Sequence, residues 1–144
     1  MSNAAANFLS VTGHAGLLNA LGATVSTAET TSSLTYTNLA TTGPSVTIVT
    51  GTTAIVVFTA NASWNGSGNQ FFVAIAVSGA TTIAAADADA YSLDEDFAFA
   101  TQTNAVSVKF TGLTPGSNTF TMKYRVDGGG PWTFQNRVMW VVAP

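Results

Sequence analysis

The sequence predicts an all-β fold: an antiparallel β-sandwich of jelly-roll type, preceded by a short N-terminal arm. Apolar and polar residues alternate with a period of two in several short segments, as in strands with one buried face. Glycine- and proline-containing turns separate these segments, and almost no stretch has a helical period. We therefore divide the 144 residues into an arm, residues 1–30, and a β-sandwich domain, residues 31–144.

The arm is the first element, and it lacks the alternation of the rest. Residues 15–21 have the composition for one or two helical turns ending at Gly22. The arm is too apolar for a free tail, so we expect it to dock onto a partner, with a frayed terminus as the alternative. The expected attachment residues are Phe8, Leu9, Val11, Leu17, Leu18 and Leu21.

The next segments read as short strands. Residues 34–40 and 46–49 are each followed by a turn containing glycine. Residues 54–60 are almost continuously apolar, which is typical of a strand covered on both sides. Residues 71–78 are also apolar on both faces, and residues 106–110 alternate.

The last two strands, residues 120–126 and 132–142, are expected to form a hairpin around the glycines of residues 127–130. In the first strand, Phe120, Met122, Tyr124 and Val126 share the core face. In the second, the expected core residues are Trp132, Phe134, Val138, Trp140 and Val142. All four basic residues are expected to face outward: Lys109, Lys123, Arg125 and Arg137.

Strands with two apolar faces need a second cover, because the outer face of a two-layer sandwich meets water. A symmetric partner would supply it, so we expect a closed homo-oligomer with contacts through Phe72, Ala74 and Ala76. Only 8% of the residues are charged and 47% are hydrophobic. This composition favours a subunit of an assembly, and a poorly soluble single domain is the alternative.

Charge and composition also exclude several classes of protein. A net charge of −3 and four basic residues argue against a nucleic-acid partner. The absence of cysteine excludes disulfides and thiolate metal sites. The N-terminus has no basic region of the kind that begins a secretory signal, and no apolar run reaches the roughly 20 residues of a membrane span.

Residues 87–96 contain five of the seven acidic residues and are the densest chemical feature. Clustered carboxylates can bind Ca²⁺, and the candidate ligands are Asp87, Asp89, Asp94, Glu95 and Asp96. The glycine and the final glutamate of an EF-hand loop are missing from this segment. We therefore expect a solvated acidic loop, with no metal and no cofactor.

Catalysis and sugar binding find less support. His14 is the single histidine and has no acid or nucleophile beside it in the sequence, so we do not expect an enzyme. Trp64, flanked by Asn65 and Asn69, is the candidate for stacking against a glycan. A core or partner contact is the alternative for this tryptophan.

Three segments together suggest a family: TYTNLATTGPSVT at residues 35–47, FVAIAVSGATT at 72–82, and TGLTPGSNTFT at 111–121 followed by KYRV at 123–126. Over residues 33–144 the chain resembles small β-sandwich virion proteins of tailed bacteriophages, which occur as capsid decoration (cement or head-fibre) proteins and in tail appendages. Fibronectin type III modules are the nearest other class, but Thr119 stands where those modules have the tyrosine of their corner.

The resemblance implies a structural, non-enzymatic decoration protein on the exterior of a phage head. It further implies a homotrimer that stabilises the shell through subunit contacts. Together with the apolar residues of the arm, it leads us to expect that the arm attaches the protein to the major capsid protein. A chain of 144 residues that starts at Met1 fits a free-standing decoration protein. The alternative is a glycan-recognising, receptor-binding module of a tail fibre or tailspike, with contacts at Trp64, Asn65 and Asn69.

Overall fold

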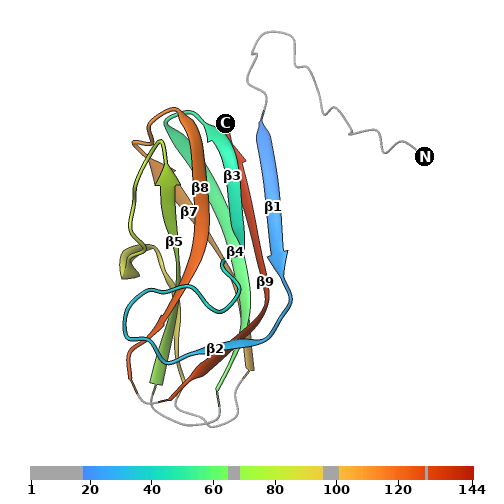
Figure 1. The fold of residues 1–144 in the computed structure, drawn as a ribbon, viewed down its shortest axis with the longest axis vertical. Coiled ribbons are helices and arrows are strands. Elements are labelled where there is room, and N and C mark those ends of the chain that lie inside the picture. The colour runs from blue at the N-terminus through green and yellow to red at the C-terminus, as the bar shows by residue number, and fades with distance from the viewer. Residues whose placement is uncertain (1–17, 65–68, 96–100, 129) are drawn as a thin grey trace, which may run out of the picture.

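The computed structural model describes residues 18–64, 69–95, 101–128 and 130–144, and it confirms the all-β sandwich (Figure 1). All strand pairs are antiparallel, and the strands form two sheets. Sheet A contains, in spatial order, β1 (Asn19–Val25), β9 (Trp132–Ala143), β4 (Thr53–Ser63) and β7 (Thr101–Thr111), and β2 (Glu29–Thr31) pairs with the start of β9. Sheet B contains β3 (Ser45–Thr50), β8 (Gly116–Val126), β5 (Asn69–Gly79) and β6 (Tyr91–Glu95).

The connectivity is that of a jelly roll. Between β3 and β9, every connection except the one from β5 to β6 passes from one sheet to the other. If β2 is set aside, sheet A holds the first, eighth, third and sixth strands of the chain, and sheet B holds the second, seventh, fourth and fifth. This is the order of two nested Greek keys.

The prediction of a C-terminal hairpin is wrong, because β8 and β9 do not pair with each other. β8 lies between β3 and β5 in sheet B, and β9 lies between β1 and β4 in sheet A. Their apolar faces meet across the core instead, where the rings of Tyr124 and Phe134 lie 4.9 Å apart. An alternating pattern reports which face of a strand is buried but not which strand lies beside it.

The predicted orientation of the second half of β9 is also wrong. Asn136 has a positive φ of 48°, and the pairing of β9 with β4 changes register at this point. This β-bulge inserts one residue and exchanges the two faces of the strand. Trp132 and Phe134 are buried as expected, whereas beyond the bulge Arg137 is buried and Trp140 is 55% exposed. Val138 and Val142, which were also expected in the core, are partly exposed on the outer face.

The N-terminal region differs from expectation as well. Residues 19–25 form an edge strand and not a helical turn, because their backbone pairs with the free edge of β9 from Asn19 opposite Ala143 to Val25 opposite Arg137. β1 and β2 thus pair within the sandwich, although we expected residues up to 30 to belong to the arm. Residues 34–40 form no strand; they run beside β8 with a single bridge between Thr37 and Tyr124.

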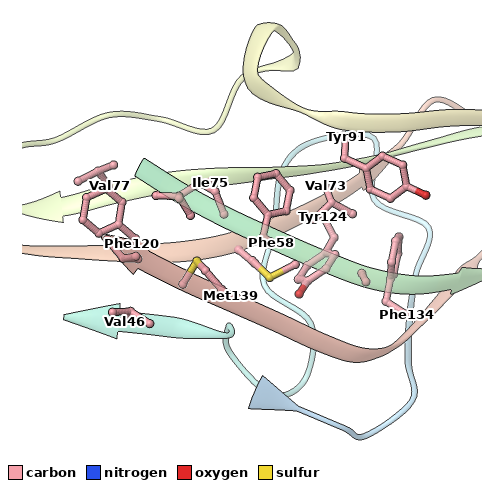
Figure 2. Packing of buried hydrophobic residues seen from close by; sticks show 14 of the residues in the cluster. Val46, Phe58, Val73, Ile75, Val77, Tyr91, Phe120, Tyr124, Phe134 and Met139 are labelled. Atoms are coloured by element: carbon pink, nitrogen blue, oxygen red, sulfur yellow. The ribbon is translucent and has the colours of Figure 1, made fainter. Parts of the chain in front are cut away.

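The core lies between the sheets, where side chains from both interdigitate (Figure 2). The expected core face of β8 is confirmed, since Phe120, Met122, Tyr124 and Val126 are all buried. Phe71 of β5 is the centre of an aromatic group, with its ring 4.5 Å from Trp132, 5.2 Å from Tyr91 and 5.6 Å from Phe134. Pairs of aromatic rings at these separations contribute beyond the area that they bury.

A charged group lies inside this core. The Arg137 guanidinium is fully buried and forms an ion pair with Glu29 of β2, with 2.7 Å between Nη2 and Oε2. It also donates to the backbone oxygens of Thr27, at 3.2 Å, and Gly43, at 3.3 Å. The Tyr124 hydroxyl donates to the same Gly43 oxygen at 2.9 Å. The Thr41 hydroxyl donates to the Glu29 carboxylate at 2.6 Å. We call these residues the Arg137 cluster: Thr27, Glu29, Thr41, Gly43, Tyr124 and Arg137.

The bulge can be tested with two adjacent valines of β9. Val141 is fully buried, and Val142 lies on the outer face. We expect Val141→Ala to lower the free energy of unfolding by about 2 kcal/mol, since it removes buried apolar volume, and Val142→Ala to lower it by less. Denaturant titration of both variants measures the difference. The opposite order would show that the strand continues without a bulge.

The Arg137 cluster gives a second expectation. Removing one partner of a buried ion pair leaves the other charge uncompensated, so Arg137→Ala should lower the free energy of unfolding by about 3–5 kcal/mol. Lys109, which is exposed on β7, is the matched surface cation, and Lys109→Ala should change stability by about 0.5 kcal/mol or less. Equal effects in thermal or denaturant unfolding would contradict the structural role of Arg137.

Candidate assembly surface

The outer face of sheet A carries a group of apolar side chains that no described segment covers. In the register of the sheet, Trp140 lies opposite Val57 of β4, and Val142 lies opposite Ile55. The exposed fractions are 55% for Trp140, 40% for Ile55 and 38% for Val57. Together with the partly exposed Val138, these side chains form the surface that we call the apolar face: Ile55, Val57, Val138, Trp140 and Val142.

Gly22 of β1 supports the apolar face from the edge of the sheet. It lies opposite Trp140, and a Cβ atom placed on it would be only 2.7–2.9 Å from three atoms of the indole. The ring therefore lies over the glycine, in space that any larger residue would occupy. This contact holds a large, exposed aromatic side chain against the sheet.

The outer face of sheet A changes character along its length. Away from the apolar face, the Asn61 side-chain amide donates to the Thr103 hydroxyl at 3.0 Å. The Gln135 side-chain amide donates to the side-chain oxygen Oδ1 of Asn61 at 3.5 Å. β1 begins and β9 ends at the opposite end of the sheet (Figure 1). Of all outward positions on β1, β4, β7 and β9, each of which is described, only Lys109 is charged, and it lies at the margin opposite Ile55.

The outer face of sheet B is different, because the chain covers part of it. The Arg125 guanidinium lies 3.6 Å from the centre of the Phe72 ring. It is held by Asp87 of η1 (Asp87–Asp89), with Nη2 to Oδ2 at 2.6 Å and Nε to Oδ1 at 2.9 Å. The Tyr36 hydroxyl donates to the same carboxylate at 2.9 Å. Arg125 was expected to be a free surface charge, and it is instead part of this cover.

The cover changes the interpretation of the expected oligomer contacts. Ala74 is fully buried within the single chain, so it has no surface left for a partner. Phe72 and Ala76 are partly buried. The two-faced pattern of β5 is thus explained in large part by the chain itself, whereas the two-faced pattern of β4 leads to an open apolar face.

The acidic residues of segment 87–96 that the structure describes lie on two elements, η1 and β6. Asp87 pairs with Arg125, Asp89 is exposed on η1, and residues 91–95, which include Asp94 and Glu95, form β6. Asp96 lies outside the described residues. Within the described ranges, no group of three or more histidine, cysteine, aspartate or glutamate residues could hold a metal ion. His14, the single histidine, lies outside those ranges.

The residues proposed for glycan contact have inward roles where they are described. Trp64 is partly buried and stacks on Trp132, with 5.7 Å between the ring centres. Asn69 is buried, and its amide donates to the Gly130 oxygen at 3.2 Å. Asn65 is outside the described residues. Neither Trp64 nor Asn69 therefore presents the exposed ring or free amide that the glycan hypothesis needs.

Four of the expected attachment residues lie outside the described residues: Phe8, Leu9, Val11 and Leu17. The two that are described are exposed: Leu18 by 70% and Leu21 by 45%. Leu18 lines an open depression of about 490 Å³ together with Val49 and Pro144, and Val49 is 65% exposed. Exposed apolar side chains therefore lie around the point at which the sandwich begins, beside Asn19 and Thr50 of the same depression.

Comparisons with protein-family models and with curated proteins find no match to this chain. Among the described residues, no helix is long and apolar enough to cross a membrane. The apolar face was missed at the sequence level because Trp140, Val138 and Val142 were expected in the core. The available signal was Asn136, a residue type that tolerates positive φ, in the middle of the strand pattern.

The electrostatic contacts predict a dependence of stability on pH. The pKa of Glu29 lies below its ordinary value of 4.5, chiefly because the Thr41 hydroxyl donates to the carboxylate, and the Arg137 guanidinium acts in the same direction. The pKa of Asp87 lies below its ordinary value of 3.8, first because of Arg125 and then because of Tyr36. Each lowered pKa stabilises the fold above the ordinary value, and this contribution is lost as the pH falls through the folded-state pKa.

We therefore expect the stability of the protein to decrease as the pH falls below about 4.5, and Glu29→Gln to make that decrease smaller. Asp89→Asn is the matched control, because Asp89 is an exposed acidic residue. Thermal unfolding of the three proteins between neutral and acidic pH measures the slopes. Identical slopes for the parent and Glu29→Gln would contradict the assignment.

Proposed function

We propose that this chain is a structural virion protein, a decoration or cement protein on the exterior of a tailed-phage head. The observation that carries the proposal is the apolar surface at the start of the sandwich, where the exposed Leu18 and Val49 flank the beginning of β1. In the sequence, Leu17, Val11, Leu9 and Phe8 precede it. This end of the molecule thus offers an apolar attachment surface, and further apolar residues precede it in the sequence.

The composition supports a role in an assembly. A protein with 8% charged residues has few groups to keep its surface hydrated. Contacts between subunits of a shell stabilise the shell by burying apolar area, at about 25 cal/mol per Å². A decoration protein that works in this way needs no catalytic group and no cofactor.

The jelly roll is compatible with the proposed function, but it is equally compatible with other functions. The same architecture occurs in viral capsid proteins and in lectins, so the fold alone does not decide between shell attachment and sugar binding. The inward roles of Trp64 and Asn69 favour attachment. A receptor-binding module of a tail fibre or tailspike remains the second hypothesis from the sequence resemblance.

The proposal is tested by removing the arm. Deletion of residues 2–17 leaves β1 and its pairing with β9 intact, so the sandwich should still fold. We expect the truncated protein to lose binding to phage heads that lack their own decoration protein, since the apolar residues before β1 are gone. Co-sedimentation with such heads measures binding, and antibody labelling of intact virions locates the protein.

Two point variants make the test sharper. Leu18→Ser should weaken head binding, whereas Leu34→Ser, at an exposed leucine in the loop between β2 and β3, should leave it unchanged. A truncated chain that binds as tightly as the full chain would place attachment on another surface of the sandwich. Labelling of the tail only would favour the receptor-binding hypothesis.

A further inference from the structure

We propose that the apolar face packs against the apolar face of a second copy of this chain, so that two sandwiches form an isologous pair through sheet A. The inference deepens the proposed function by naming a subunit contact. It does not require a shell, and it uses a surface distinct from the open depression beside Leu18. It can therefore fail or succeed independently of the attachment to a phage head.

The first argument is the amount of apolar surface left open. Trp140, Ile55 and Val57 are adjacent in the register of the sheet, and all three are exposed. A single exposed apolar residue is ordinary on a protein surface, but an adjacent group that includes a tryptophan marks an interaction site. Tryptophan is also among the residues that contribute most to binding energy at interfaces.

The second argument is charge. Lys109 is the only charged residue at the outward positions of the four long strands of sheet A, all of which are described, and it lies at the margin. The acidic residues that give the chain its net charge of −3 are absent from these positions. Two copies can therefore meet face to face without bringing like charges into the centre of the contact, where such pairs are costly.

The third argument is shape and size. With eleven residues in β4 and four strands side by side, the outer face of sheet A measures roughly 35 Å by 19 Å, at about 3.3 Å per residue and about 4.8 Å per strand. A contact over this face would bury roughly 1,300 Å² in total, which lies within the lower part of the range of specific interfaces. The polar half, with Asn61, Thr103 and Gln135, would supply the rim.

Among the described surfaces of this chain, the best match for the apolar face is the apolar face of a second copy. Other large exposed apolar residues in the described part are Leu18, Leu21, Leu34 and Val49. Leu18 and Val49 lie around the depression at the end of the sandwich, Leu21 lies on the edge strand β1, and Leu34 lies in a loop, so none of these provides a second broad sheet surface. A self-complementary face closes as a twofold pair, whereas the trimer expected from the sequence resemblance requires a contact between unlike surfaces.

The pair is tested in solution by sedimentation velocity over a range of concentrations of the full chain. We expect a reversible monomer–dimer equilibrium. Val57→Lys should raise its dissociation constant by about 100-fold or more, because two unpaired lysines are brought into the contact. Leu34→Lys is the matched control, since it places a lysine on an exposed apolar residue in the loop between β2 and β3, outside the strands of sheet A, and it should leave the constant unchanged.

Ser107→Arg provides an independent probe. Ser107 is exposed and lies opposite Val57 on β7, so the substitution tests the same face without removing an apolar side chain. It should also dissociate the pair, and circular dichroism should show that each variant keeps its fold. A monomeric full chain at all concentrations would overturn the inference, and this is the result expected if the arm covers the face. A trimer, or a dimer unaffected by both Val57→Lys and Ser107→Arg, would overturn it as well.

Discussion

The buried ion pair between Arg137 and Glu29 is the interaction on which the arrangement of the sandwich depends. Arg137 reaches the core from β9, and Glu29 comes from β2, which pairs with the first part of the same strand. Thr41 binds the free side of the carboxylate, and Gly43 accepts from both Arg137 and Tyr124. The cluster thereby fastens the long segment between β2 and β3 against both sheets, although that segment contains no strand of its own.

The same bulge that buries Arg137 exposes Trp140. A strand without the bulge would send Arg137 outward and Trp140 inward, in agreement with the simple alternation of the sequence. With Asn136 inserted at a φ of 48°, the guanidinium enters the core and the indole leaves it for the surface above Gly22. The apolar face and the Arg137 cluster are thus two consequences of one backbone irregularity, and bulges are features that often re-aim a side chain for a purpose.

Much of the fold could be predicted from the sequence. Alternation in β8 identified the strand and its buried face correctly, and the apolar patterns of β4 and β5 identified these segments as strands, because both depend on local periodicity. The expected cover on both sides of β4 is wrong for the described chain, since Ile55 and Val57 are exposed. Strand partners could not be predicted, since the apolar faces of β8 and β9 are compatible with a hairpin or with contact across the core. The cover over Phe72 could not be predicted from local sequence patterns either. Its residues, Tyr36, Asp87 and Arg125, come from three distant parts of the chain.

The outer faces of the two sheets therefore differ in how much apolar surface they expose. On sheet B, a charged cover made by the chain itself shields Phe72 and leaves little apolar area to drive a contact. On sheet A, no described segment covers Trp140 and its neighbours, and the edge strand β1 links this face to the surface around Leu18. β1 is held in sheet A by its pairing with β9 alone. β1 consequently borders both surfaces proposed for assembly: its first residue lines the depression beside Leu18, and Gly22 lies under Trp140. The last pair of β1 joins Val25 to Arg137, the residue that anchors the core.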